Sequence, residues 1–437
     1  MKQICDMYQK KQRPVKVIQF GDGVFLRGFF DWMLQILNDQ GLFDGGAVVV
    51  KPTASQGRTE EFAGQKFLYT NLIRDLEGQE RQIVDVLDRV VRPYEDFAGF
   101  LALAELPEAR FILSNTTEAG ILFCPDDSFS DEPPSSFPAK LTRLLYRRYS
   151  LGMEGFWILP CELIEQNGDR LRELVLQYGA LWGLGETFAQ WVTERNRFCN
   201  TLVDRIVSGF VQDAALPYQD SFCNGAESFH FWAIEGGQGL FSELPLNRAG
   251  LNVVLTDDLT PYREQKVRIL NGAHTAMACL GLKLGLETVE DCMKNKEVVS
   301  FVTGYVEQEV LDTVPLPRRQ CEEFWQAAQR RFQNPYLRHA LSAISLNSVS
   351  KFRVRILPVI LDLERQGRKA TQGLRAWRHL IDWYKTGTPR DSGEAIRRIR
   401  QGSLESILSD ASLWGSDYSR FAREMEELGD KKGRRLQ

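Results

Sequence analysis

Residues 15–23, Val15-Lys-Val-Ile-Gln-Phe20-Gly21-Asp22-Gly23, determine how the first half of this chain is expected to fold. A short apolar run ends at the first glycine of a Gly-x-Gly turn, and apolar residues at helical spacing follow from Phe25 to Asn38. This order predicts a buried strand, a tight turn and a helix. In an open α/β sheet, such a unit binds a dinucleotide pyrophosphate on backbone N–H groups.

Four further apolar runs are strand candidates, and helical spacing separates most of them; they are residues 47–50, 110–113, 156–159 and 251–256. Alternating strands and helices predict an α/β fold, a Rossmann-like doubly wound parallel sheet. Beyond about residue 258, helical periodicity dominates and strand signals nearly vanish. We therefore expect a dinucleotide-binding domain over residues 1–257 and a mainly α-helical substrate and catalytic domain over residues 258–437.

Composition narrows the class of protein. The net charge is −4 and charged residues make up 26% of the 437 positions, so no strong positive field attracts nucleic acid. No apolar run approaches the ~18–20 residues of a membrane span, and the start lacks a signal-like apolar stretch, which predicts a cytoplasmic protein. The four histidines form no metal-binding spacing, so no metal site is expected. The basic stretch 431–435 is interpreted as a solvated tail.

The glycine turn supplies the candidate cofactor-binding residues, Gly21, Asp22, Gly23, Phe25 and Arg27. The fingerprint is incomplete, because its third glycine would fall at Leu26, and a bare Gly-x-Gly is also an ordinary tight turn. The acid expected after the second strand is replaced by Lys51. An acid there would bind the adenosine ribose, whereas a cation would tolerate a 2′-phosphate, so NAD is expected and NADP stays open.

A second polar loop, Ser114-Asn115-Thr116-Thr117-Glu118-Ala119-Gly120, follows the strand candidate at 110–113. Ligands bind at the carboxyl ends of strands in open α/β sheets, so Asn115 and Thr116 are further cofactor-binding candidates. An ordinary turn that caps a helix is an equally good interpretation of these small polar residues.

The stretch Lys266-Val-Arg-Ile-Leu-Asn271-Gly-Ala-His274-Thr carries three polar groups suited to catalysis. On a regular α-helix, Lys266, Asn271 and His274 project at about 0°, 140° and 80° around the axis, so one broad face holds all three. That face could provide a proton carrier and hydrogen-bond donors for a developing oxyanion. Tyr262-x-x-x-Lys266 also matches the catalytic pair of short-chain dehydrogenases, which we interpret as coincidence because that family is a single domain.

Three motifs together resemble the polyol-specific long-chain dehydrogenases, the mannitol dehydrogenase family. They are Gly21-Asp-Gly-Val-Phe-Leu-Arg27, Asn200-Thr-Leu-Val-Asp204-Arg205-Ile and Lys266-x-x-x-x-Asn271-Gly-x-His274-Thr. The resemblance implies metal-independent hydride transfer, with Lys266 as general acid/base, Asn200 and Asn271 bonding the reacting oxygen, and His274 binding substrate. Further stretches are most similar to members that act on uronates, including Ser114–Gly120 and Pro160-Cys-Glu-Leu-Ile164.

The resemblance implies a sugar acid or polyol as substrate and D-tagaturonate as the expected one. Fructuronate, or mannitol and fructose, are the alternatives within the family, and a catalytically silent nucleotide-binding regulator is the alternative of another class. A uronate carboxylate needs a cation, for which Lys351 and Arg353 in Lys351-Phe-Arg353-Val-Arg355 are the candidates, against the alternative of solvated helix charges. Oligomeric state is left open, with a monomer compatible.

Overall fold

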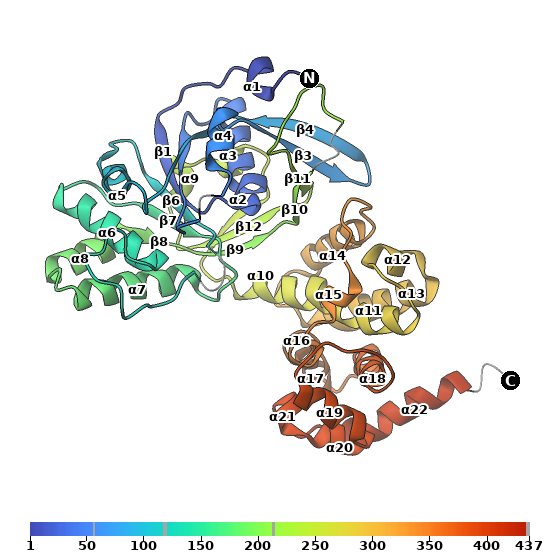
Figure 1. The fold of residues 1–437 in the computed structure, drawn as a ribbon. Helices are drawn as coiled ribbons and strands as arrows, with labels where there is room; N and C mark the ends of the chain where they lie inside the picture. Colours follow the sequence, from blue (N-terminus) through green and yellow to red (C-terminus); the bar gives the residue numbers. More distant parts are fainter. Residues whose placement is uncertain (56, 117–119, 212–214, 434–437) are drawn as a thin grey trace. The chain divides into compact units, whose positions relative to one another are not determined.

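The computed structural model describes residues 1–437 except for 56, 117–119, 212–214 and 434–437 and the side chains of 429–433. Its contacts divide the chain into two compact units, Met1–Leu259 and Thr260–Gln437. The first is built on β-sheets and the second from helices (Figure 1).

A six-stranded parallel sheet forms the centre of the first unit. Its strands lie in the order β5 (Leu87–Val91), β2 (Gly46–Val50), β1 (Val15–Phe20), β6 (Phe111–Ser114), β7 (Trp157–Pro160) and β8 (Arg197–Phe198). All five neighbouring pairs are parallel. The predicted α/β fold, a Rossmann-like sheet followed by a helical region, is thereby confirmed.

Both faces of this sheet are covered, and its strands β2, β6 and β7 are buried along their whole length. Val17 belongs to one core with the apolar side of α3 (Phe30–Asp39). Ile18 and Phe20 belong to the opposite core, with the helices α5 (Phe97–Leu101), α6 (Phe137–Ser150), α7 (Asn167–Leu181) and α8 (Glu186–Arg195). Burial on both faces is typical of doubly wound sheets and explains why the strands read as continuous apolar runs.

Two smaller sheets complete the first unit and were not predicted. One holds β10 (Val207–Phe210), β11 (Asn224–Glu227), β3 (Tyr69–Asp75) and β4 (Gly78–Val84), and the other β13 (Val253–Thr256), β12 (Phe231–Glu235) and β9 (Asn200–Asp204). The strand expected at 251–256 is β13 and lies in the three-stranded sheet rather than the parallel one. The remaining short helices are α1 (Ile4–Met7), α2 (Val24–Gly28), α4 (Thr59–Gly64) and α9 (Leu240–Glu243).

The helix expected from Phe25 to Asn38 is interrupted. Helix α2 ends at Gly28, Phe29 has non-helical angles (φ −124°, ψ −81°), and α3 begins at Phe30. A Cβ at position 28 would lie 2.8 Å from both methyl groups of Val207 in β10. The glycine therefore permits the close approach of the small sheet to the end of α2.

The second unit has one core, formed around α11 (Gly272–Lys283), which is buried on all sides. Helix α11 packs against α13 (Lys296–Tyr305), α15 (Leu341–Ile344), α16 (Ser348–Arg355) and α18 (Thr371–Thr386). The other helices are α10 (Thr260–Gln265), α12 (Val289–Lys294), α14 (Arg318–Phe332), α17 (Leu357–Arg365), α19 (Gly393–Gln401), α20 (Leu404–Ser409), α21 (Ala411–Trp414) and α22 (Ala422–Gly433).

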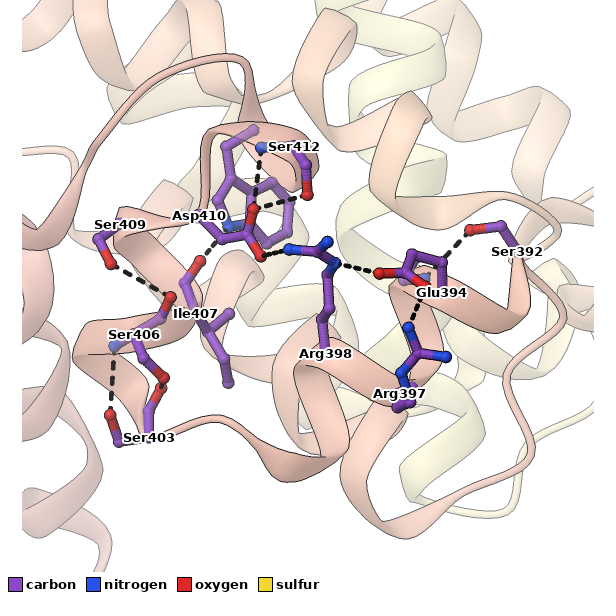
Figure 2. A network of polar contacts seen from close by, with 12 residues as sticks. Ser392, Glu394, Arg397, Arg398, Ser403, Ser406, Ile407, Ser409, Asp410 and Ser412 are labelled. Atoms are coloured by element: carbon purple, nitrogen blue, oxygen red, sulfur yellow. Dashed lines mark hydrogen bonds and ion pairs between the residues drawn. The ribbon is translucent and has the colours of Figure 1, made fainter.

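A polar network joins the helices α19 and α21 near the end of the chain (Figure 2). Arg398 of α19 donates to Glu394 (Nε–Oε1, 2.6 Å) and to Asp410 (Nη1–Oδ2, 2.9 Å). Asp410 in turn accepts hydrogen bonds from the backbone N–H and the hydroxyl of Ser412 at the start of α21. The network links α19 to the start of α21 at a largely exposed place.

Candidate active site

The glycine turn and the Asn115 loop lie side by side at the carboxyl edge of the parallel sheet. Strand β1 has β2 on one side and β6 on the other, so the order of strands reverses here, which is where ligands bind in open α/β sheets. Asn115 N–H donates to Phe20 O (3.1 Å). Gly21 has a φ of +120°, and a Cβ there would lie 2.9 Å from Asn115 O. Only glycine fits this position, for both reasons.

Asp22, in the middle of the turn, forms an ion pair with Lys51. Lys51 Nζ lies 2.5 Å from Asp22 Oδ2; the lysine side chain is 7% exposed and the aspartate side chain 36%. The lysine that the sequence places after β2 therefore points back to the glycine turn. Of the other turn residues, Gly23 is exposed and Phe25 stacks on Phe29 with 5.0 Å between ring centroids.

Arg27 lies beside the turn, in a small pocket of about 160 Å³ that Asp22 and Arg58 also line. Its guanidinium lies over the ring of Phe62 (4.4 Å to the centroid) and is buried. Burial lowers the pKa of Arg27 from its usual value, with smaller opposing contributions from Tyr69 and Asp31. Its Nη1 has no hydrogen-bond partner in the described part of the chain. A buried guanidinium with an unused donor is suited to binding an anionic or polar ligand.

The polar side chains after β6 are held by buried neighbours. Asn115 Nδ2 donates to Cys161 O (2.9 Å), and Thr116 donates to Glu162 Oε1 from both its backbone N–H and its hydroxyl, each at 2.9 Å. Ser114 Oγ donates to the other oxygen of Glu162 (2.9 Å). Burial raises the pKa of Glu162 despite these donors. Of the predicted loop, residues 117–119 lie outside the described part of the chain.

The side-chain amide of Asn200, which is predicted to bond the reacting oxygen, already has protein partners for its nitrogen and its oxygen. Its Nδ2 donates to Asp169 Oδ2 (2.8 Å) and Glu235 Oε1 (3.0 Å), and its Oδ1 accepts from Asp169 N–H (3.0 Å). Both amide hydrogens therefore have protein acceptors. Contact with a reacting oxygen requires that Asn200 give up one of these bonds, so its catalytic role stays a prediction.

In the helical unit, the stretch that carries Lys266 and Asn271 is not a regular α-helix. Residues Lys266–Asn271 form a π-helical turn between α10 and α11. In a π-helix each N–H bonds five residues back, so residues five apart return to similar faces. The expected offset of about 140° between Lys266 and Asn271 is therefore wrong, and the two lie on closer faces than an α-helix allows. Such turns occur frequently at functional sites.

His274 lies at the centre of a cluster of nitrogen bases and cations. Its ring packs against Phe332 (4.5 Å between centroids) and His339 (4.9 Å). Burial lowers the pKa of His274 well below its usual value, and His339, Arg331 and Arg355 lower it further. His274 is therefore a neutral imidazole at pH 7, a hydrogen-bond partner rather than a charge. Arg331 and His339 were not predicted, since their positions 57 and 65 residues after His274 carry no local pattern.

Of the two predicted substrate-binding cations, only Lys351 faces this cluster. Burial lowers the pKa of Lys351, and Arg355 one turn later adds to the effect. Arg355 Nη1 donates to Thr275 Oγ1 (3.1 Å), next to His274. Arg353 is exposed and its Nη2 lies 3.0 Å from the position of a Cβ on Gly415. The geometry does not favour Arg353, because residues two apart on a helix face different directions, and it favours Arg355 instead.

The described residues contain no group of three or more His, Cys, Asp and Glu side chains arranged to hold a metal ion. No helix among them is both long and apolar enough to cross a membrane.

The parallel sheet with a glycine turn at its switch point, followed by a helical unit, defines a two-unit protein with a Rossmann-type sheet. Residues 15–248 match the mannitol dehydrogenase Rossmann domain, and residues 258–398 match the mannitol dehydrogenase C-terminal domain. The chain belongs to the mannitol dehydrogenase family, as the resemblance in its motifs predicted.

The chain is also similar to individual proteins and solved structures. The altronate oxidoreductase of Yersinia enterocolitica is 41% identical over 94% of this chain and 92% of its own length. That of Pectobacterium carotovorum is 44% identical over 94% of this chain and 85% of its own. Among solved structures, a substrate-free D-sorbitol dehydrogenase has a TM-score of 0.85 at 21% identity, covering 97% of this chain and 96% of its own. The Pseudomonas fluorescens mannitol 2-dehydrogenase, solved with NAD and D-mannitol, has a TM-score of 0.69 at 20% identity, covering 96% and 92%. These structures share the fold.

Proposed function

We propose that this protein catalyses the reversible NAD-dependent reduction of D-tagaturonate to D-altronate. Curated relatives at 41–44% identity over nearly the whole chain are named altronate oxidoreductases. Residues 1–257 would hold the dinucleotide, and residues 258–437 would supply the substrate-binding and catalytic side chains.

The observation that carries the choice of substrate is the cationic cluster next to His274. Lys351 donates to Ile344 O (2.8 Å) and Arg355 to the hydroxyl of Thr275, and neither forms an ion pair within the described residues. Half-buried cations usually have a counter-charge, because leaving water without one is costly. Asp391 attracts Lys351 but forms no ion pair with it within the described residues. The carboxylate of a uronate would provide a direct counter-charge, whereas mannitol and fructose are neutral and would provide none.

The residues at the switch point fit a dinucleotide. Gly21 has no side chain and adopts a φ of +120°, so the backbone of the turn is uncovered at this position. Arg27 Nη1, beside the turn, is a buried donor without a partner in the described part of the chain. Gly21, Asp22, Gly23, Phe25 and Arg27 would hold it, with Asn115 and Thr116 from the neighbouring loop. When bound, the nicotinamide would supply the hydride in reduction and accept it in oxidation.

The helical unit would carry out the proton transfer. Lys266 would donate a proton to the substrate oxygen in reduction and accept it in oxidation, a contribution of roughly 10²–10⁴-fold for a well-placed general acid. Asn271, which the π-helical turn brings onto a closer face, would donate a hydrogen bond to the same oxygen. His274, neutral at pH 7, would bond a substrate hydroxyl without adding charge. Asn200 of the sheet unit is also proposed to bond the reacting oxygen, for which it would exchange its bond to Asp169 or Glu235.

The test is the oxidation of NADH and NADPH, followed at 340 nm, with D-tagaturonate, D-fructuronate and D-fructose in parallel. Rapid turnover of D-tagaturonate with NADH is the expected result. A preference for D-fructuronate would support the proposed role of Lys351 and Arg355, but the substrate would be the other uronate, which differs in stereochemistry. Equal turnover of D-fructose would remove the role proposed for Lys351 and Arg355. Binding of NADH without turnover of any of the three would favour a nucleotide-binding regulator.

A further inference from the structure

The pairing of Asp22 with Lys51 changes what each side chain can offer to a nucleotide. Lys51 follows β2, at the position where Rossmann folds commonly carry an acid for the adenosine ribose. Its ammonium group is 2.5 Å from Asp22 and its side chain is 7% exposed, so it is not presented to a ligand. Asp22 is 36% exposed, and its Oδ1 makes no hydrogen bond within the described part of the chain. Of this ion pair, the carboxylate of Asp22 is therefore the partner that a ligand can reach.

We propose that Asp22, held by Lys51, accepts hydrogen bonds from the adenosine ribose hydroxyls and so selects NAD over NADP. This inference rests on the proposed use of a dinucleotide. A carboxylate accepts from ribose hydroxyl groups, and each such charge-assisted bond is stronger than a neutral one. The 2′-phosphate of NADP has no hydroxyl to donate there and would bring two negative charges against the carboxylate.

The two arginines that line the pocket do not reverse this preference. Arg58 has its donors in use, because Nε and Nη2 form a bidentate ion pair with Glu61 (2.6 and 2.7 Å) and Nη1 donates to Ser221 O (3.1 Å). Arg27 has an unused donor, and a phosphate of the pyrophosphate is a suitable partner for it. Because NAD and NADP share the pyrophosphate, Arg27 adds to the affinity for both and leaves the choice to the ribose.

Lys51 acts in this proposal as a positioning residue. A carboxylate at a glycine turn has several rotamers, and the ammonium group restricts Asp22 to the one in which Oδ2 faces β2 and Oδ1 remains available. Substitution of Lys51 with methionine keeps the apolar stem in its buried position and removes only the ammonium group. A positioning Lys51 and a phosphate-binding Lys51 therefore predict different changes in the dissociation constants of NADH and NADPH when the ammonium group is removed.

The experiment measures dissociation constants for NADH and NADPH without substrate, from the quenching of tryptophan fluorescence. We expect the wild-type protein to bind NADH at least tenfold more tightly than NADPH. Asp22→Asn should weaken NADH by roughly ten- to hundredfold while NADPH is unchanged or tighter. Lys51→Met should weaken NADH and should not weaken NADPH selectively. Glu105→Gln, which breaks the exposed Arg147–Glu105 pair in the same unit, is the matched control and should change neither constant.

Three outcomes would overturn the inference. An unchanged ratio of the two constants in Asp22→Asn would show that Asp22 does not read the ribose. Tighter binding of NADPH than NADH by the wild-type protein, with selective loss of NADPH in Lys51→Met, would make Lys51 a 2′-phosphate ligand. Failure of the wild-type protein to bind either nucleotide would overturn the dinucleotide function as well. Circular dichroism spectra identical to wild type establish that each variant is folded.

Discussion

The polar groups at the edge of the parallel sheet and those around His274 are satisfied in opposite ways. After β6, Ser114 and Thr116 donate to the buried carboxylate of Glu162, and Asn115 donates to a backbone carbonyl. Around His274, Lys351 and Arg355 donate only to a carbonyl and a hydroxyl, and their charges are not balanced by an ion pair within the described residues. At the sheet edge the polar side chains thus bond one another and the backbone, whereas Lys351 and Arg355 in the helical unit bond only neutral acceptors.

Removal of the proton carrier should give the largest effect. Lys266→Met should lower kcat by roughly 10²–10⁴-fold, because general acid/base catalysis contributes about that much. NADH binding should not change, since the proposed nucleotide residues belong to the sheet unit. Steady-state rates with D-tagaturonate and fluorescence titration with NADH measure the two separately.

Lys283→Met is the matched control for that substitution. Lys283 ends α11, the helix that follows the π-helical turn, and forms an ion pair with Asp382 (2.8 Å), so it matches Lys266 in charge but lies outside the turn. Its variant should retain near wild-type rates. Equal losses in both variants would mean that Lys266 contributes charge or stability rather than a proton.

Arg355→Met should give the next largest effect. Loss of a charge-assisted contact of about 1.5–3 kcal/mol should raise KM for D-tagaturonate by roughly ten- to hundredfold. Arg353→Met, two residues earlier on the exposed side of α16, should leave KM unchanged. The KM values of both variants, measured side by side, test the comparison directly, and a larger effect of Arg353 would restore the original sequence prediction.

Glu162→Ala should destabilise the sheet unit and should not affect the cations Lys351 and Arg355, which belong to the helical unit. It leaves the buried N–H of Thr116 and two hydroxyls without their acceptor, which should cost about 1–3 kcal/mol in the free energy of unfolding. Urea unfolding measures this loss. Glu105→Ala is the control, since its carboxylate pairs with Arg147 at an exposed position and should contribute less. A stable Glu162→Ala variant would show that the edge is not held by this carboxylate.

Arg398→Met should have the smallest effect of the series. Its two carboxylate partners hold helices α19 and α21 in an exposed network (Figure 2). Water and salt replace exposed ion pairs at little cost. Urea unfolding of this variant should be indistinguishable from wild type, whereas a resolvable loss would show that the network has a structural role of its own.

The sequence predicted the parts of the fold that depend on local pattern. The apolar runs of β1, β2, β6 and β7 stand out because strands buried on both faces have no polar alternation. The hairpin of β3 and β4 was missed, since β4 begins with Gly78-Gln-Glu-Arg81, which is exposed and polar and has no strand signature. The break at Phe29 was missed; Gly28 beside it lies against Val207, about 180 residues away in sequence, a contact that no local pattern reveals.

The candidate site followed the same rule. The Gly-x-Gly turn and the Lys266–His274 stretch were visible because they are short and contiguous. Glu162, Arg331 and His339 were not, because their importance depends on which side chains they meet in three dimensions. The sequence does not distinguish Arg353 from Arg355 as the substrate-binding cation, because spacing alone does not reveal which face of α16 is turned toward α11.

The π-helical turn at Lys266–Asn271 has a consequence for how this helix can be altered. A π turn holds one residue more than the α-helix around it, so it acts as a phase shift of about 100° between α10 and α11. Deleting one residue within the turn would straighten it and rotate Lys266 out of step with every side chain from Gly272 onward, although no polar group is removed. Chain length across these six positions is therefore as much a determinant of chemistry as the residues themselves.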